Sequence, residues 1–350
     1  MVYTLNMGLP ACFGLWMSAP SFPAGRAVPV AADCSNNLRP CLAGCLLFLI
    51  GLFISVPGRA EVVAVLFPDV REPFRKVFVS IIEGIRAHPG LDARTLALTP
   101  GTDQAAVQAF IRRERVQAVI ALGKRAYLAA NAVLDDGDLP LVLGALLLPP
   151  GSRDATGMTG VSLAVDPYPL FETLRQLSPA METVHVVYSE DSLSWLVERA
   201  QEAAQLNGLK LVRHGVRSRR EGARMYRKVL KSIDGRKEAL WLPPDAKSLD
   251  ERAVLPLLLR EAWRSSFVVF SSNPVHAKRG ALFALFPDNR QMGAELGELV
   301  IACLRQSHQR CPQGVRLTQA LQSAVNTRTA EHVGVTLNNG ERFSLKFPVR

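Results

Sequence analysis

Short apolar runs alternate with helical patterns along the chain from Glu61 onward. The runs of strand length are apolar at nearly every position, as in EVVAVLF at 61–67 and VQAVIALG at 116–123. A segment between them, at 71–88, has apolar residues every three or four positions, which is the spacing of a helix with one buried face. Strands that are apolar on both faces are typical of parallel sheets covered by helices. The pattern therefore predicts an α/β unit over residues 61–147.

A second unit of the same kind follows a break in the pattern. Residues 148–167 are rich in Pro, Gly, Ser and Thr, and the alternation restarts after them. The elements predicted in the second unit are strands at 182–188, 209–213, 238–242 and 266–271, and helices at 168–178, 191–206, 220–233 and 248–264. We therefore predict two doubly wound α/β units in tandem, followed by a less regular tail.

The first 60 residues differ from the rest of the chain. They include a stretch without a charge at 41–56, which is short for a transmembrane helix and suits the apolar region of a secretory signal. Small residues at Gly58 and Ala60 provide a cleavage site before Glu61. We interpret residues 1–60 as an extended leader and expect a periplasmic protein. The alternative is an uncleaved membrane anchor.

The composition is that of a globular protein with an excess of basic residues. Apolar residues make up 48% and charged residues 21% of the chain, and the formal net charge is +10. A positive charge favours anionic partners, but the basic run at 213–228 has no interleaved aromatic platform. We interpret this run as a loop and a solvated helix face. We expect no nucleic-acid partner, because export would also separate the protein from nucleic acid.

Sequence motifs of catalysis and metal binding are absent. The chain has no Gly-x-Ser-x-Gly elbow, no His-Glu-x-x-His pair and no phosphate-binding Gly-x-x-x-x-Gly-Lys loop. Its histidines are scattered without metal-ligand spacing, so we predict no enzyme activity, no metal site and no cofactor. Beyond the leader only Cys303 and Cys311 remain, and an even pair in an exported protein indicates a disulfide. Two unpaired thiols are the alternative.

A polar turn, Ser189-Glu190-Asp191-Ser192, connects an apolar strand to a helix. Hydroxyl and carboxylate groups in such a turn can cap the free N–H groups of the helix. The turn also lies at the carboxyl end of a strand, where ligands bind in this architecture, and a helix N-terminus attracts anions such as a ligand carboxylate. Capping and ligand binding are both open for Ser189 and Ser192.

Several stretches beyond residue 115 occur in a characteristic order. They are VQAVIALGKRAYLAANAV, GMTGVSLAVDPYPLFETL, VVYSEDSLSW, ALWLPPDAKSL, SSNPVHAKRGALFAL and VNTRTAEHVGVTL. In these stretches the chain resembles the substrate-binding proteins of ABC importers, among them those that bind aromatic amino acids. The resemblance covers most of 61–337. It implies the type I periplasmic-binding-protein fold, with two lobes joined by three crossing strands and a small-molecule ligand between them. It also implies an ABC permease in the inner membrane as partner, and we expect a monomer.

The resemblance also suggests domain boundaries and site residues. Lobe 1 is expected at 61–162 plus 276–308, and lobe 2 at 163–275 plus 309–350. The expected ligand-binding residues, at strand ends and at the first crossing, are Asp69, Gly123, Lys124, Ser162, Ser189, Ser192, Asp245 and Ser271. The structural alternatives are helix capping for Asp69 and Asp245, and hinge packing for Ser162. Trp195 and Trp241 could stack on an apolar ligand or belong to the core.

The sequence thus predicts an exported solute-binding protein of an ABC importer that captures a small molecule by hinge closure, with an amino-acid-like compound as one candidate ligand. Three stretches around the expected cleft depart from the family pattern: FPDVREP, GALLLPPG and NRQMGAELG. They favour an alternative, in which a periplasmic sensory or accessory protein kept the fold without solute uptake.

Overall fold

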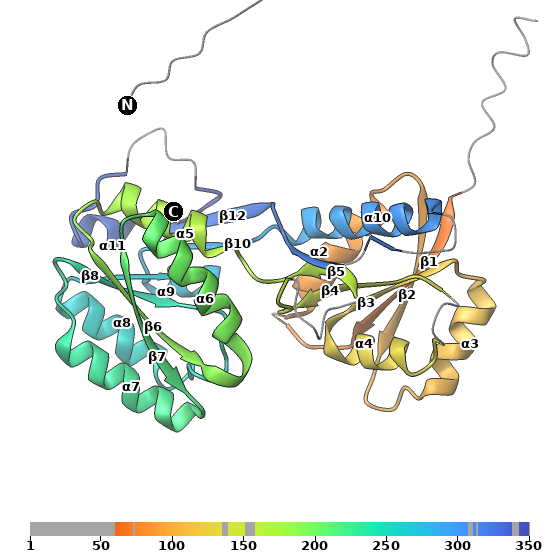
Figure 1. Ribbon diagram of the computed structural model, residues 1–350, viewed down its shortest axis with the longest axis horizontal. Coiled ribbons are helices and arrows are strands. Elements are labelled where there is room, and N and C mark those ends of the chain that lie inside the picture. The colour runs from red at the N-terminus through yellow and green to blue at the C-terminus, as the bar shows by residue number, and fades with distance from the viewer. Residues whose placement is uncertain are drawn as a thin grey trace, which may run out of the picture. The chain divides into compact units, whose positions relative to one another are not determined.

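The computed structural model describes residues 60–349 except 73, 135–138, 151–157, 307–310, 313 and 338–342. The predicted leader, up to residue 59, and its apolar stretch at 41–56 lie outside the described residues. In the part of the chain that is described, no helix is long and apolar enough to cross a lipid bilayer. The chain forms two α/β lobes, each built around its own sheet (Figure 1).

The sheet of lobe 1 has six strands in the order β11-β5-β4-β3-β1-β2, and every neighbouring pair is parallel. The strands are β1 (Glu61–Pro68), β2 (Leu91–Leu98), β3 (Ala118–Leu122), β4 (Leu141–Leu146), β5 (Thr159–Ser162) and β11 (Gly314–Leu317). The central strand β3 is buried at every position, as expected for an apolar strand covered on both faces.

Helices cover both faces of this sheet. They are α2 (Phe74–Arg86), α3 (Gln104–Glu114), α4 (Gly123–Asn131) and α10 (Asn289–Arg305). One face forms a core with α2 and α10, and the other forms a core with α3 and α4. Helices α2 and α10 approach closely at Gly84 and Gly293, where an added Cβ would collide with the carbonyl oxygen of Arg290 or of Ile81.

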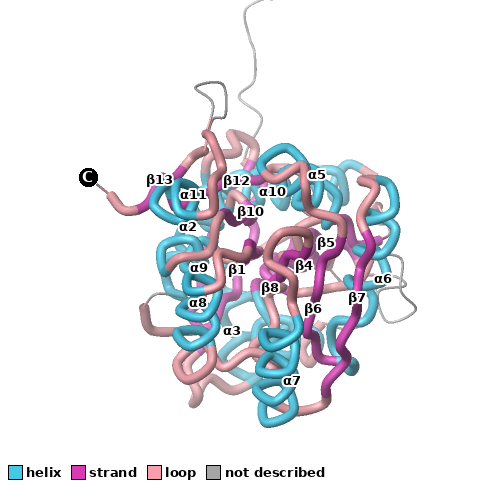
Figure 2. The backbone as a smooth tube through the Cα atoms, turned by 90° about the vertical axis from the view of Figure 1, so that its left-hand side faces the viewer, coloured by secondary structure: helices cyan, strands magenta, loops and turns pink. Residues whose placement is uncertain are grey.

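The sheet of lobe 2 has seven strands in the order β13-β12-β10-β9-β8-β6-β7. The strands are β6 (Thr183–Ser189), β7 (Lys210–Val216), β8 (Glu238–Leu242), β9 (Val268–Ser271), β10 (Phe283–Pro287), β12 (Leu321–Asn326) and β13 (Leu345–Phe347). Strands β10 and β12 are antiparallel and the other pairs are parallel. Strand β7 forms one edge of the sheet, beside β6 (Figure 2).

The helices of lobe 2 also lie on both faces of their sheet. They are α5 (Pro167–Leu177), α6 (Glu190–Leu206), α7 (Arg219–Ser232), α8 (Leu255–Arg264), α9 (Pro274–Arg279) and α11 (Thr327–His332). One core contains the inner faces of α5 and α6, and the opposite core contains those of α7 and α8. The two-lobed, mainly parallel α/β architecture predicted from the sequence is confirmed.

Strand pairing moves the expected lobe boundaries. The sequence placed the return to lobe 1 at 276, but α9 and β10 belong to lobe 2 because Phe283 and Ala284 of β10 pair with β9. The chain returns to lobe 1 at α10, and β11 pairs with β5 before β12 re-enters the second sheet. The chain thus passes between the sheets three times, after β5, β10 and β11.

One predicted helix begins later than expected. The helix predicted at 248–264 starts at Leu255, after turns in which the Asp250 carboxylate accepts the N–H groups of Arg252 and Ala253. Aspartate closes such a turn with its own backbone and so competes with helix formation.

Candidate ligand-binding site

Three of the residues predicted to bind ligand in lobe 1 follow the carboxyl ends of β1 and β3. Asp69 is exposed, and its N–H extends the sheet ladder by donating to the Leu98 carbonyl at 3.0 Å. Gly123 begins α4 with φ of 82°, in the left-handed region that favours glycine. Lys124 is exposed. Among the described residues neither the Asp69 nor the Lys124 side chain has a hydrogen-bond or ion-pair partner, so both are free to meet a ligand.

Ser162, at the end of β5, is fully buried and its hydroxyl is already bonded. The Oγ lies 3.4 Å from the Leu146 carbonyl and accepts the N–H groups of Leu148, at 3.1 Å, and Ala164, at 3.3 Å. These contacts hold the end of β4 against the start of the first crossing. The geometry favours hinge packing over ligand binding for Ser162.

Asp245 connects two loops at the carboxyl edge of the second sheet. Its Oδ2 accepts the N–H of Ser189, after β6, at 2.6 Å. Its Oδ1 accepts the N–H groups of Lys247 at 3.0 Å and Ser248 at 3.3 Å, in the loop after β8. Because the carboxylate is committed to three backbone donors, the geometry favours a structural role for Asp245 over pairing with a ligand ammonium group.

The turn at 189–192 leaves the start of α6 without a side-chain cap. Ser189 occupies the N-cap position, is 2% exposed, and makes no side-chain hydrogen bond to the helix backbone. Its Oγ instead accepts the hydroxyl of Ser192 at 3.0 Å. Ser192 is exposed, so it is the hydroxyl of this turn that a ligand can reach. The first N–H groups of a helix are free to bind an anion where no side chain caps them.

Ser271 belongs to a polar chain that runs from the buried Ser271 and His276 to the half-exposed Glu251. Its Oγ lies 2.8 Å from His276 Nδ1, and His276 Nε2 lies 3.3 Å from Glu251 Oε1. Serine, histidine and a carboxylate in this order resemble a hydrolytic triad. However, Ser271 is 0% exposed, and its Oγ also contacts the Leu242 carbonyl at 3.0 Å and the Asn273 N–H at 3.0 Å. The hydroxyl therefore stabilises the turn after β9 and has a structural role.

The sequence did not predict a role for Glu251, although it completes this chain. The hydrogen bond from His276 lowers the pKa of the Glu251 carboxyl below its ordinary value; burial acts in the opposite direction, and the charges of His276 and Arg279 add to the lowering. The contact between Glu251 Oε1 and His276 Nε2, at 3.3 Å, holds the loop before α8 against α9.

Asp288, at the second crossing, is another residue that the sequence analysis missed. Its Oδ1 accepts the N–H groups of Arg290 and Gln291 at 3.0 Å each, capping α10, and its Oδ2 accepts the Gln322 side-chain amide at 2.9 Å. Burial alone would raise the pKa of the Asp288 carboxyl, but these donors and Arg290 together lower it below its ordinary value. An aspartate directly before a helical pattern was the available signal.

The two tryptophans considered as ligand contacts pack in or against the core. Trp241 is 0% exposed and packs edge-to-face on Phe171, with ring centroids 5.6 Å apart. Its indole N–H donates to Ser272 Oγ at 3.3 Å. Trp195 is partly buried against the same core as α5 and α6. Stacking of a ligand on Trp241 is therefore excluded in this arrangement.

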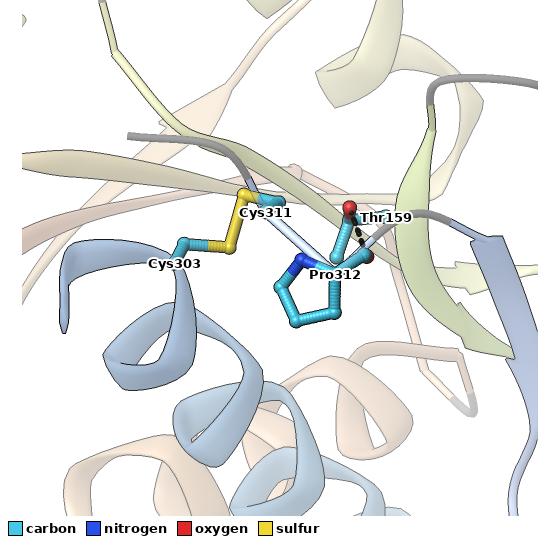
Figure 3. The surroundings of a disulfide bond; sticks show 4 residues. All are labelled: Thr159, Cys303, Cys311 and Pro312. Carbon is cyan, nitrogen blue, oxygen red and sulfur yellow. Dashed lines mark hydrogen bonds between the residues drawn. A yellow bond between two sulfur atoms is a disulfide. The ribbon is translucent and has the colours of Figure 1, made fainter. Parts of the chain in front are cut away.

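Cys303 and Cys311 form a disulfide between the last turn of α10 and the segment before β11 (Figure 3). Beside it, the Thr159 hydroxyl donates to the Pro312 carbonyl at 2.7 Å and ties β5 to the same segment. Within the described ranges, no group of three or more His, Cys, Asp or Glu side chains is placed to hold a metal ion.

Comparison with known proteins identifies relatives of this fold. Residues 102–342 match the family described as ABC transporter substrate binding protein. No curated protein matches the sequence. A conserved domain protein from Vibrio cholerae has 18% identity and a TM-score of 0.57, over 82% of this chain and 100% of that one.

Two further solved structures are similar. One is an ABC domain in complex with L-Trp from Streptococcus pneumoniae, with 18% identity and a TM-score of 0.58 over 83% of this chain and 100% of that one. The other is the ligand-free, open form of a substrate-binding protein with adhesive properties from Clostridium difficile, with 17% identity and a TM-score of 0.60 over 82% of this chain and 99% of that one. These likenesses show the fold. Since the family match spans more than half of the sequence, the chain belongs to the ABC transporter substrate-binding proteins, which bind solutes and are not enzymes.

Proposed function

We propose that this chain is the exported solute-binding component of an ABC importer and binds a small molecule that bears a carboxylate. The observation that supports the proposal most directly is the uncapped start of α6, with the accessible hydroxyl of Ser192 beside it. Bare helix N–H groups suit a carboxylate oxygen, and the Ser192 O–H, which donates to Ser189 Oγ in this structure, would turn to donate to it. The similar domain in complex with L-Trp supports an amino-acid ligand.

The ligand contacts of lobe 1 are proposed to come from Asp69 and Lys124, whose exposed side chains have no partner within the described residues. Asp69 would pair with a ligand ammonium group, and Lys124 would bind an anionic or hydroxyl group. The three crossings after β5, β10 and β11 would be the hinge, since each is a short connection between the sheets. Closure would couple ligand affinity to a change of lobe angle that a membrane permease can detect.

Export to the periplasm is proposed from two independent features. The uncharged stretch at 41–56 suits a secretory signal. The disulfide between Cys303 and Cys311 would persist in an oxidising compartment and would be rare in the cytosol.

Thermal unfolding of the purified protein against a panel of amino acids, sugars and polyols tests the proposal. We expect one class of carboxylate-bearing solute to raise Tm with increasing concentration. Replacing Ser192 with Ala should weaken the affinity by about 10- to 100-fold, the effect of losing a hydrogen bond to a charged group. Ser194→Ala is the matched control, because the Ser194 hydroxyl is bonded to the Glu190 carbonyl of the same helix at 2.7 Å. If no solute raises Tm, or if both variants weaken binding equally, the proposed site is wrong.

A sensory or accessory role without uptake is the second candidate, favoured by the departures FPDVREP and GALLLPPG from the family pattern. Uptake of the radiolabelled solute in a deletion strain separates the two roles. Loss of uptake, restored by the intact gene, supports import. Unchanged uptake despite solute binding by the protein supports the sensory role.

A further inference from the structure

Helix α7 has one buried face and one cationic face. Its buried residues are Gly222, Tyr226 and Val229, which pack in the core shared with α8. The exposed face has a stripe of four cations at spacings of four, three and four residues: Arg220, Arg224, Arg227 and Lys231. Residues at this spacing lie one above another on a helix. We call these four residues the α7 stripe.

No acidic side chain among the described residues pairs with the α7 stripe. Within the described part of the chain, none of its four side chains forms an ion pair or a side-chain hydrogen bond. Glu221 is the single acidic residue of the helix, and its carboxylate accepts the backbone N–H of Arg217 at 2.9 Å. Like charges four residues apart destabilise a helix, so this arrangement is unfavourable for the isolated domain. A bound anionic surface would reverse that effect.

Neighbouring charges extend the positive field toward the edge of the sheet. Lys228 is exposed on α7 beside the stripe, and Lys210 is exposed on the edge strand β7. Burial, and then the nearby His185 and Lys228, lower the pKa of His214 on β7 below its ordinary value. Helix α7 lies at the lower margin of lobe 2 in both views (Figures 1 and 2).

The geometry points to an anionic phospholipid surface as the partner of the α7 stripe. Protein interfaces have an apolar core with aromatic anchors. None of the described large apolar residues that are exposed lies on α7, so the helix does not offer such a core. Single-stranded nucleic acid requires aromatic stacking, and Tyr226, the one aromatic residue of α7, is 1% exposed. Lipid headgroups require only positive charge close to the surface. The apolar stretch at 41–56 adds a second membrane signal in the same chain if it is retained.

Vesicle partitioning of the full chain tests the inference. The measured quantity is the partition coefficient for phosphatidylglycerol-containing vesicles divided by that for pure phosphatidylcholine vesicles. The ratio isolates the charge effect, because an apolar segment would bind both kinds of vesicle. Each cation near an anionic surface contributes about fivefold to partitioning, so replacing all four stripe residues with Gln should lower the ratio by about 600-fold. Salt at about 0.5 M should abolish the preference of the unaltered chain.

The matched control replaces the same number of exposed cations on four different helices: Arg86, Arg112, Arg125 and Arg328. It changes the net charge equally but leaves the stripe intact, and we expect it to keep most of the preference. Tm of the stripe variant should not fall, because arginine, lysine and glutamine have similar helix propensities. The inference is overturned if both variants lose the preference equally, if neither loses it, or if the stripe binds DNA or an acidic polypeptide and not vesicles.

Discussion

The carboxylate of Asp245 offers the sharpest test of how the second lobe is built. If Asp245 is a structural residue, Asp245→Ala destabilises the protein; if it contacts ligand, the same change mainly removes ligand affinity. The structure favours the first outcome because Oδ2 accepts the buried Ser189 N–H at 2.6 Å and Oδ1 accepts the Lys247 and Ser248 N–H groups.

The expected loss follows from these three hydrogen bonds. Ser189 is 2% and Ser248 is 1% exposed, so their N–H groups cannot be solvated easily when the carboxylate is removed, whereas Lys247 is exposed and its N–H can bond to water. A buried donor left without an acceptor costs about 1–3 kcal/mol. Two such donors predict that Asp245→Ala lowers the free energy of unfolding by about 2–6 kcal/mol.

Urea denaturation with and without solute measures both possible effects. The control is Asp103→Ala, since Asp103 caps α3 through one hydrogen bond to Ala106 N–H at 2.8 Å and should contribute about 1 kcal/mol. The structural interpretation is refuted if Asp245→Ala is no more destabilising than this control. Unchanged stability together with lost solute binding would restore Asp245 as a ligand residue.

Two other consequences of the structure can be tested by unfolding experiments. The Asp288 carboxyl has a lowered pKa in the folded protein, so the stability it contributes is present above its ordinary pKa and is lost as pH falls through the folded value. The urea concentration at half-unfolding should therefore decrease when the pH is lowered below about 4. Asp288→Asn should reduce this acid dependence, and an unchanged pH profile would contradict the assignment. Gly84→Ala should destabilise lobe 1 by about 1–3 kcal/mol, because its Cβ meets the Arg290 carbonyl of α10. Gly101→Ala, with no atom within 4 Å of the new Cβ, should stay within about 0.5 kcal/mol, and equal losses in the two variants would refute the close helix contact.

Some of the candidate site residues were predictable because their signal is local. The polar turn at 189–192 lies between an apolar strand and an amphipathic helix, and the structure has β6 ending and α6 beginning there. The resemblance placed the run at 276–287 in lobe 1, but strand pairing places it in lobe 2. That run contains β10, whose side chains Phe283 and Leu285 fill the core of lobe 2. An apolar strand satisfies its local pattern in either sheet, so the pattern could not select between them.

The sequence by itself determined the kind of architecture: apolar strands joined by amphipathic helices require a parallel sheet covered on both faces, wherever the strands pair. Tertiary structure alone decided which groups meet. The Asp245 carboxylate accepts the Ser189 N–H across a separation of 56 residues, and Glu251 meets His276 across 25. Such pairings depend on strand order and loop path, which local periodicity does not encode. They convert two residues predicted to bind ligand, Asp245 and Ser271, into structural braces and leave Ser192 as the accessible hydroxyl of the polar turn.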